Sequence, residues 1–146
     1  MLGYTKSNIL EPVYEGVNNI LDLFRKEMIV KCGYKRFDGN NIKFDNSGFS
    51  VIDVYFDCGK IIGKYLINCE SLIFLVVTLG DVYEKLFESF KIKNDYLEMY
   101  LVDKIASEIV EAAADKLEKM IEENLAADHL QITNRYSPGY CGWNVS

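Results

Sequence analysis

A long run of helical periodicity constrains this chain most strongly. Between Asp95 and Asn124, and just beyond, apolar residues recur at every fourth position with charged residues between them. The recurring residues are Leu101, Ile105, Ile109, Ala113, Leu117, Ile121 and Leu125. This spacing places an apolar stripe on one face of a helix and a charged surface on the other. The chain is therefore predicted to fold around one long amphipathic helix.

Three shorter segments also carry helical spacing. Glu11 to Met28 and Gly59 to Asn68 each repeat apolar residues every three to four positions. A third helix is expected after Asp81, a residue type that often caps helix N-termini. The remaining chain must supply the elements against which these helices pack.

Aromatic and β-branched runs predict that the rest is a sheet. Tyr34 to Phe37, Asn41 to Phe44 and Ser50 to Phe56 are separated by turn-forming residues, which favours an antiparallel hairpin or meander. Ser71 to Thr78 is continuously apolar, as expected of a central strand covered on both faces. The predicted fold class is α+β, with a twisted antiparallel sheet packed against helices that include one long helix.

Length and charge narrow the class of protein further. At 146 residues the chain is expected to form a single domain spanning residues 1–146. A net charge of -6 gives no electrostatic reason to bind nucleic acid. The longest apolar run, Leu72 to Val77, is too short to cross a bilayer, and Met1 to Lys6 lack the pattern of a leader sequence. We therefore expect a cytoplasmic protein with neither a nucleic-acid nor a membrane partner.

The cysteines form no recognisable ligand set. Cys32, Cys58, Cys69 and Cys141 are scattered without a paired CxxC spacing. A zinc or cluster site would therefore need an unusual arrangement, and free thiols are the better expectation. A redox or metal module that uses these four residues stays open as a weaker hypothesis.

Specific chemistry is concentrated after the long helix, between Asn134 and Trp143. There Pro138 and Gly139 predict a tight turn, because proline presets one central position and glycine accepts a positive φ at the next. One arginine, two tyrosines, a thiol and the only tryptophan surround this pair. The chain ends shortly afterwards, and we expect a C-terminal segment to be lacking.

This stretch resembles a known family. The hexapeptide Arg135-Tyr136-Ser137-Pro138-Gly139-Tyr140 is similar to the R-x-[AS]-P-G-Y motif of the activation domain of cobalamin-dependent methionine synthase. The apolar strand ending at Thr78 and Gly80 and the long helix precede it in the order found in that family. The Pro-Gly-Tyr-Cys-Gly-Trp form is similar to shorter, stand-alone relatives from anaerobes.

The resemblance implies an S-adenosylmethionine-binding module that supports reductive reactivation of a cobalamin-dependent methyltransferase. It implies that Arg135, Ser137 and Tyr140 contact the ligand, while Pro138 and Gly139 shape the turn that presents them. The implied partners are a corrinoid-binding protein or methionine synthase modules, with cobalamin on the partner, and an electron donor. No catalytic residue and no metal ligand is assigned, and the family's acidic ligand contact has no matching position here.

The chemistry of these residues agrees with that role. An arginine fork can grip a carboxylate bidentately while staying charged. A tyrosine ring beside a sulfonium gains a cation–π attraction of about 1 kcal/mol. Arg135 and Tyr140 are accordingly the side chains with the clearest chemistry for this ligand.

Several neighbouring residues have a simpler interpretation. Tyr136 and Trp143 are expected to pack as part of a terminal strand against the long helix. Cys141 is expected to be a bystander, and His129 to occupy a helix end, where a cationic side chain suits the dipole. Acidic pairs such as Glu122 and Glu123 are expected on a solvated helix face. The rival to the ligand-binding hypothesis is a partner-docking or small-ligand-binding domain of the same fold that performs no methyl transfer.

Overall fold

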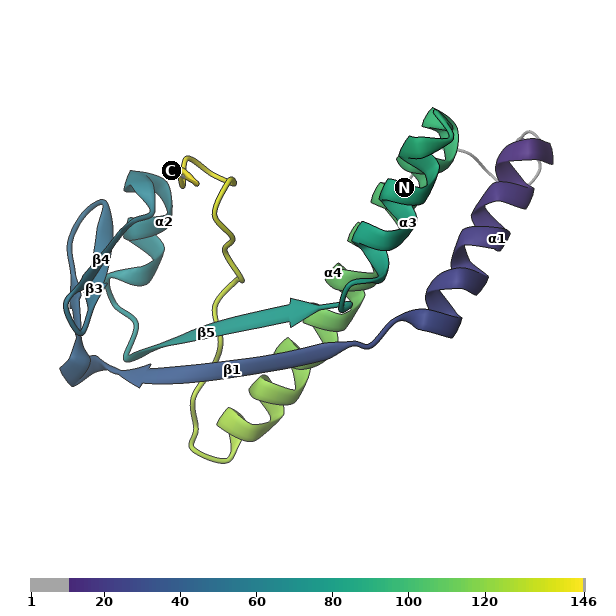
Figure 1. Cartoon of the computed structure of the whole chain (residues 1–146). Coiled ribbons are helices and arrows are strands. Elements are labelled where there is room, and N and C mark those ends of the chain that lie inside the picture. Colours follow the sequence, from purple (N-terminus) through teal and green to yellow (C-terminus); the bar gives the residue numbers. More distant parts are fainter. Residues whose placement is uncertain (1–10, 146) are drawn as a thin grey trace. The chain divides into compact units, whose positions relative to one another are not determined.

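The computed structural model describes residues 11–145 and confirms the α+β class (Figure 1). In chain order the elements are α1 (Glu11–Glu27), β1 (Lys31–Asp38), the 3₁₀ helix η1 (Gly39–Asn41), β2 (Ile42–Phe44), β3 (Gly48–Val51), β4 (Val54–Asp57), α2 (Gly59–Leu66), β5 (Ser71–Thr78), α3 (Val82–Ile92) and α4 (Tyr96–Ala126). All four predicted helices are present, and α4 is the predicted long one. The opening segment from Met1 to Lys6 lies outside the described residues.

The described chain divides into two compact units. The first contains the described residues up to Cys32 together with Val76–Ile121, and the second contains Gly33–Leu75 together with residues 122–145. The boundaries fall inside β1, β5 and α4, so three continuous elements belong partly to each unit. This division does not test the expectation of a single domain, which stays a prediction.

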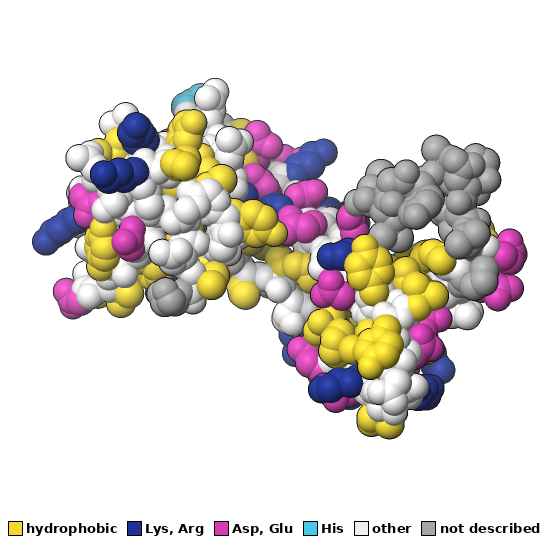
Figure 2. Space-filling model, turned by 90° about the horizontal axis from the view of Figure 1, so that it is seen from above, with side chains coloured by type: hydrophobic (Ala, Val, Ile, Leu, Met, Phe, Trp, Pro, Cys, Tyr) yellow, Lys and Arg dark blue, Asp and Glu magenta, His cyan; other side chains and the backbone are white. Residues whose placement is uncertain are grey.

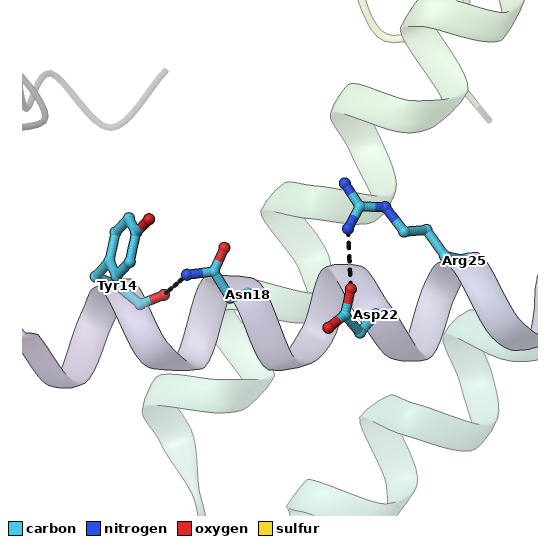
Figure 3. A network of polar contacts seen from close by, with 4 residues as sticks. All are labelled: Tyr14, Asn18, Asp22 and Arg25. Atoms are coloured by element: carbon cyan, nitrogen blue, oxygen red, sulfur yellow. Dashed lines mark hydrogen bonds and ion pairs between the residues drawn. The ribbon is translucent and has the colours of Figure 1, made fainter.

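Three helices form the core of the first unit. Apolar residues of α1, α3 and α4 pack together with Leu79; those buried are Ile20, Phe24, Leu79, Val82, Leu86, Leu101, Val102 and Ala106. The outer face of α1 is polar: Arg25 bonds Asp22 at 2.9 Å, and Asn18 donates to the Tyr14 carbonyl at 3.0 Å (Figure 3). The amphipathic pattern predicted for this helix is confirmed.

The buried stripe of α4 follows the predicted spacing only in part. Leu101, Leu117, Ile121 and Leu125 are buried, whereas Ile105, Ile109 and Ala113 are only partly covered. A helix turns once per 3.6 residues, so a strict four-residue repeat drifts around its surface. Val102, Ala106 and Ala114 are the additional buried residues of this helix. The period identified the helix correctly but not every residue of its buried face.

A residue with left-handed backbone angles follows the C-terminal end of α3 and of α4. After α3, Asn94 has φ 56°, its N–H bonds the Lys91 carbonyl, and the next N–H reaches back to Phe90. After α4, His129 has φ 60°, its N–H bonds Ala126, and Leu130 reaches back to Leu125. Both patterns are Schellman motifs, which satisfy the last carbonyls of a helix. His129 therefore occupies the helix-end position that was expected for it.

The second unit contains a three-stranded antiparallel meander, β2–β3–β4. Its register aligns Phe44 with Phe49 and Phe49 with Phe56, so three rings line one face. The Phe49 ring lies 5.1 Å from that of Phe56 and 6.0 Å from that of Phe74. The buried residues around this aromatic column are Ile42, Phe49, Val51, Cys58, Ile62 and Leu66. The meander and α2 thus share one core.

Two predictions about the strands were wrong. The run from Ser50 to Phe56 is not one strand, because a turn at Ile52, with φ 55°, separates β3 from β4. A positive φ at a β-branched residue is rare, and Asp53, the second residue of the turn, is the one turn-favouring residue between the two strands. β5 is not a buried central strand: it pairs with β1 in a two-stranded sheet, and none of its residues is fully buried. A continuous apolar run indicates that both faces of a strand are apolar, but it does not show how many strands pair with it.

Charged side chains of both signs lie among hydrophobic ones on the face of the protein shown in Figure 2. They gather there into no extensive patch of one sign. Of the helices within residues 11–145, none combines the length and the apolar character needed to cross a bilayer.

Candidate ligand-binding turn

The predicted Pro-Gly turn is confirmed. The N–H of Tyr140 donates to the carbonyl of Ser137 at 3.2 Å, which closes a four-residue turn. Pro138 and Gly139 are its central residues, and Gly139 has φ 95°. Proline followed by a residue with positive φ is the signature of a type II turn. Local chemistry alone therefore determines how this part of the motif folds.

A second turn, which was not predicted, follows at once. The N–H of Trp143 donates to the Tyr140 carbonyl at 2.9 Å. The residues between them, Cys141 and Gly142, have φ values of 52° and 84°, the type I′ pattern. The N–H of Gly139 also donates to the Trp143 carbonyl at 2.7 Å, which ties the two turns together. We call residues 137–143 the double turn.

The double turn is anchored at both ends within the second unit. Before it, the Tyr136 ring stacks on that of Tyr65, with centroids 6.2 Å apart and planes 19° from parallel. At its far end, the Trp143 ring meets that of Phe49 edge-on at 6.3 Å. Tyr136 and Trp143 therefore serve packing as expected, but they pack on the second core and α2, and the expectation of a terminal strand on the long helix was wrong. These contacts hold the intervening residues in place from two sides.

Close backbone contact fixes the direction of this segment along α2. A Cβ atom on Gly59 would lie 2.9 Å from the Gly142 carbonyl oxygen, too near for a side chain. Gly142 therefore meets the first residue of α2, while Tyr136 meets Tyr65 near the end of the same helix. The terminal segment consequently runs antiparallel to α2, and Figure 1 shows it ending beside that helix.

The five predicted site residues lie together because they are consecutive or nearly so. Arg135 is half-buried, whereas Ser137, Pro138 and Gly139 are exposed. Tyr140 exposes 71% of its surface. These side chains are accessible to a ligand at the surface of the protein.

A separate surface hollow lies on the meander and η1. It is lined by Asn40, Asn41, Lys43, Ser50 and Ile52. None of the residues predicted for the site contributes to it.

Burial affects the ionisable groups next to the turn. It raises the pKa of the Tyr136 hydroxyl, which keeps that group a neutral hydrogen-bond donor at physiological pH. Burial also raises the pKa of the Cys58 and Cys69 thiols, so neither is activated as a nucleophile. Cys141 and Cys32 are exposed free thiols.

Residue types that bind metals are not clustered within residues 11–145. Over residues 11–145, no group of three or more His, Cys, Asp or Glu side chains is placed to hold a metal ion. The described thiols therefore give no support to the metal-module hypothesis.

One residue next to the turn was missed. Tyr65 lies in the Gly59 to Asn68 run whose spacing predicted a helix, and no role was predicted for it, yet 62% of its surface is exposed. Its contact with Tyr136 joins positions 71 residues apart in sequence. Local patterns cannot show such a contact, although an exposed apolar residue on a short helix is a signal once burial is known.

Neither a scan against protein-family models nor a search of curated proteins finds a match for this chain.

Proposed function

We propose that this protein is an S-adenosylmethionine-binding module that supports reductive reactivation of a cobalamin-dependent methyltransferase such as methionine synthase. The observation that carries the proposal is the turn from Ser137 to Tyr140, which presents the residues of the motif on a segment anchored by Tyr136 and Trp143. Anchoring matters because a preorganised site loses less entropy when a ligand binds.

The residues of the turn fit the chemistry of this ligand. Arg135 would bind the α-carboxylate through two parallel N–H donors. The exposed hydroxyl of Ser137 can donate to or accept from the ligand's polar groups. The open ring of Tyr140 would lie against the sulfonium. None of these residues serves as a nucleophile or as a general acid or base.

The proposed division of labour assigns the methyl acceptor to a partner. The methyl group of the bound ligand would pass to a reduced corrinoid carried by a corrinoid-binding protein or by methionine synthase modules, with an electron donor supplying the reduction. This chain would orient the sulfonium and provide a docking surface. We place this activity in the cytoplasm, where free thiols such as Cys32 and Cys141 stay reduced.

One observation favours a second candidate function. Four of the five predicted site residues, Ser137 to Tyr140, are exposed, and the described hollow is elsewhere on the meander and η1. A turn of this kind also suits a partner-docking domain that binds no S-adenosylmethionine. Direct ligand binding distinguishes the two functions.

Isothermal titration calorimetry and thermal unfolding test the proposal. S-adenosylmethionine should release or absorb measurable heat and raise the unfolding temperature, because a ligand that binds only the folded state stabilises it. Arg135→Ala should weaken binding by about tenfold or more, since a charge-assisted hydrogen bond contributes about 1.5–3 kcal/mol. Arg135→Lys should recover only part of this loss, because lysine lacks the planar fork.

The matched control is Arg25→Ala. Arg25 is an exposed arginine paired with Asp22 on α1, and its loss should leave binding unchanged. If millimolar S-adenosylmethionine produces neither heat nor stabilisation, the proposal is wrong. Equal affinity of the wild type and Arg135→Ala would remove Arg135 from the site.

A further inference from the structure

We propose that Tyr65 of α2 is a further ligand-binding residue, whose exposed ring face stacks on the adenine of the bound nucleoside. This inference rests on the proposed function and adds a contact from a different element of the second unit. Its basis is the position of Tyr65 beside the motif and the exposure of its ring.

The pattern of burial along α2 first points to this residue. Ile62, Gly63 and Leu66 face the core and are buried. Ile61 and Tyr65, one helical turn apart, expose 58% and 62% of their surfaces. Leaving two large apolar side chains in water on an eight-residue helix forgoes the free energy that their burial would contribute. A ligand that covers them would recover part of it.

The contact with Tyr136 makes the Tyr65 ring a fixed platform. The two rings are 19° from parallel with centroids 6.2 Å apart, so one face of Tyr65 is held against Tyr136. Tyr136 is half-buried and packs against the second core, which limits its movement. With 62% of its surface exposed, Tyr65 presents its other face to solvent. A flat ligand group can extend this stack without reorganising it.

Connectivity places that open ring close to the rest of the proposed site. Tyr136 follows Arg135 in the chain and touches Tyr65 through its ring, so a single residue links the carboxylate-binding arginine to the platform. The double turn begins at the next residue, Ser137. The proposal places a ligand held by Arg135 and the turn against the Tyr65 ring.

Adenine is the part of the ligand that fits this platform best. Offset stacking of flat rings is favourable and needs no charge. Tyr140 already offers a ring to the sulfonium, and Tyr136, the other aromatic residue of the motif, is half-buried between Tyr65 and the second core. The apolar side chain of Ile61 lies one turn along the same face of α2 and can cover the ring edge.

Two ligands and three variants test this assignment by calorimetry. Tyr65→Leu should weaken binding of both S-adenosylmethionine and S-adenosylhomocysteine by about five- to tenfold, because both carry adenine. Tyr65→Phe keeps the ring and should bind as the wild type does. Tyr96→Leu changes another exposed tyrosine on a helix, 74% exposed, and should have no effect.

The single tryptophan distinguishes contact with the ligand from support of the turn. Trp143 packs on Phe49, so its fluorescence reports whether the double turn stays docked. The inference requires that Tyr65→Leu leave this fluorescence unchanged while weakening both ligands. Loss of binding together with shifted fluorescence would make Tyr65 a positioning residue and overturn the proposed contact.

Two other outcomes would also overturn it. Unchanged affinity in Tyr65→Leu would remove the residue from the site, and weakening limited to S-adenosylmethionine would assign its ring to the sulfonium instead of adenine. A wild-type protein that binds neither ligand would instead contradict the proposed function itself. The two failures are therefore distinguishable.

Discussion

Replacing Gly63 with alanine tests how tightly α2 packs on the turn between β2 and β3. By helix propensity alone, Gly63→Ala should stabilise the protein by about 1 kcal/mol. However, the new Cβ would lie 2.8 Å from the carbonyl oxygen of Asn46 and 3.2 Å from the Cα of Ser47. Both are backbone atoms, so relief requires the helix and the turn to move apart.

The size of the effect follows from these opposing contributions. Overpacking a well-filled core costs about 1–3 kcal/mol, which exceeds the gain in propensity. We therefore expect Gly63→Ala to lower the free energy of unfolding by up to about 2 kcal/mol. In urea this corresponds to a midpoint lower by up to about 1 M, given a slope of about 2 kcal/mol/M.

Gly16→Ala is the matched control. It also adds a methyl group to a helix, but its nearest neighbours are the ends of flexible side chains, Leu101 Cδ1 at 3.0 Å and Glu98 Oε1 at 3.1 Å. These can shift, so its unfolding free energy should stay equal or rise by up to about 1 kcal/mol.

Trp143 fluorescence should follow the unit that contains Gly63, and far-UV circular dichroism should follow the helices. A Gly63→Ala protein at least as stable as the wild type would refute the close packing between α2 and the turn.

Two further predictions concern pH. The backbone N–H of Ser47 donates to the Asp45 carboxylate and lowers its pKa, and Tyr55 and Gly48 are further donors. These bonds stabilise the fold at pH values above the unfolded pKa of Asp45, near 3.8. The stabilisation is lost as pH falls through the lower folded pKa. Urea unfolding from pH 5 to 2 should therefore depend less on pH in Asp45→Asn, and an unchanged profile would contradict this. Burial raises the pKa of the Glu98 carboxyl group above 4.5, and the charge of Asp95 raises it further. The free energy of unfolding should therefore fall as pH rises through the folded pKa of Glu98. Glu98→Gln should remove that fall and be more stable at pH 7, whereas lower stability there would show that ionised Glu98 stabilises the fold.

The elements that sequence predicts well here are those decided by neighbouring residues. The Pro138-Gly139 turn forms because both residues favour its backbone angles, and α4 forms because its periodicity extends over many turns. Contacts between distant segments were not predictable in the same way. The pairing of β5 with β1 and the stacking of Tyr65 on Tyr136 depend on how separate parts of the chain meet.

The candidate site shows the same contrast between features set by neighbouring residues and contacts between distant segments. The motif identified Arg135, Ser137 and Tyr140 by their types and order, and their role in ligand binding stays a prediction. The second turn was missed because Cys141 carries no preference for a positive φ, and the structure alone reveals its value of 52°. Tyr65 was missed because helical spacing does not show which apolar residues stay exposed.

The placement of the unit boundaries inside β1, β5 and α4 has a consequence for dissecting the protein genetically. Each unit is assembled from two separate stretches of the gene, so no single stop codon or start site yields one of them whole. Residues 33–75 are inserted between the two stretches of the first unit, and residues 122–145 return to the second. A truncation from either end therefore removes one stretch of a unit and leaves its other stretch in the protein. Isolating either unit requires splicing its two coding segments through a designed linker.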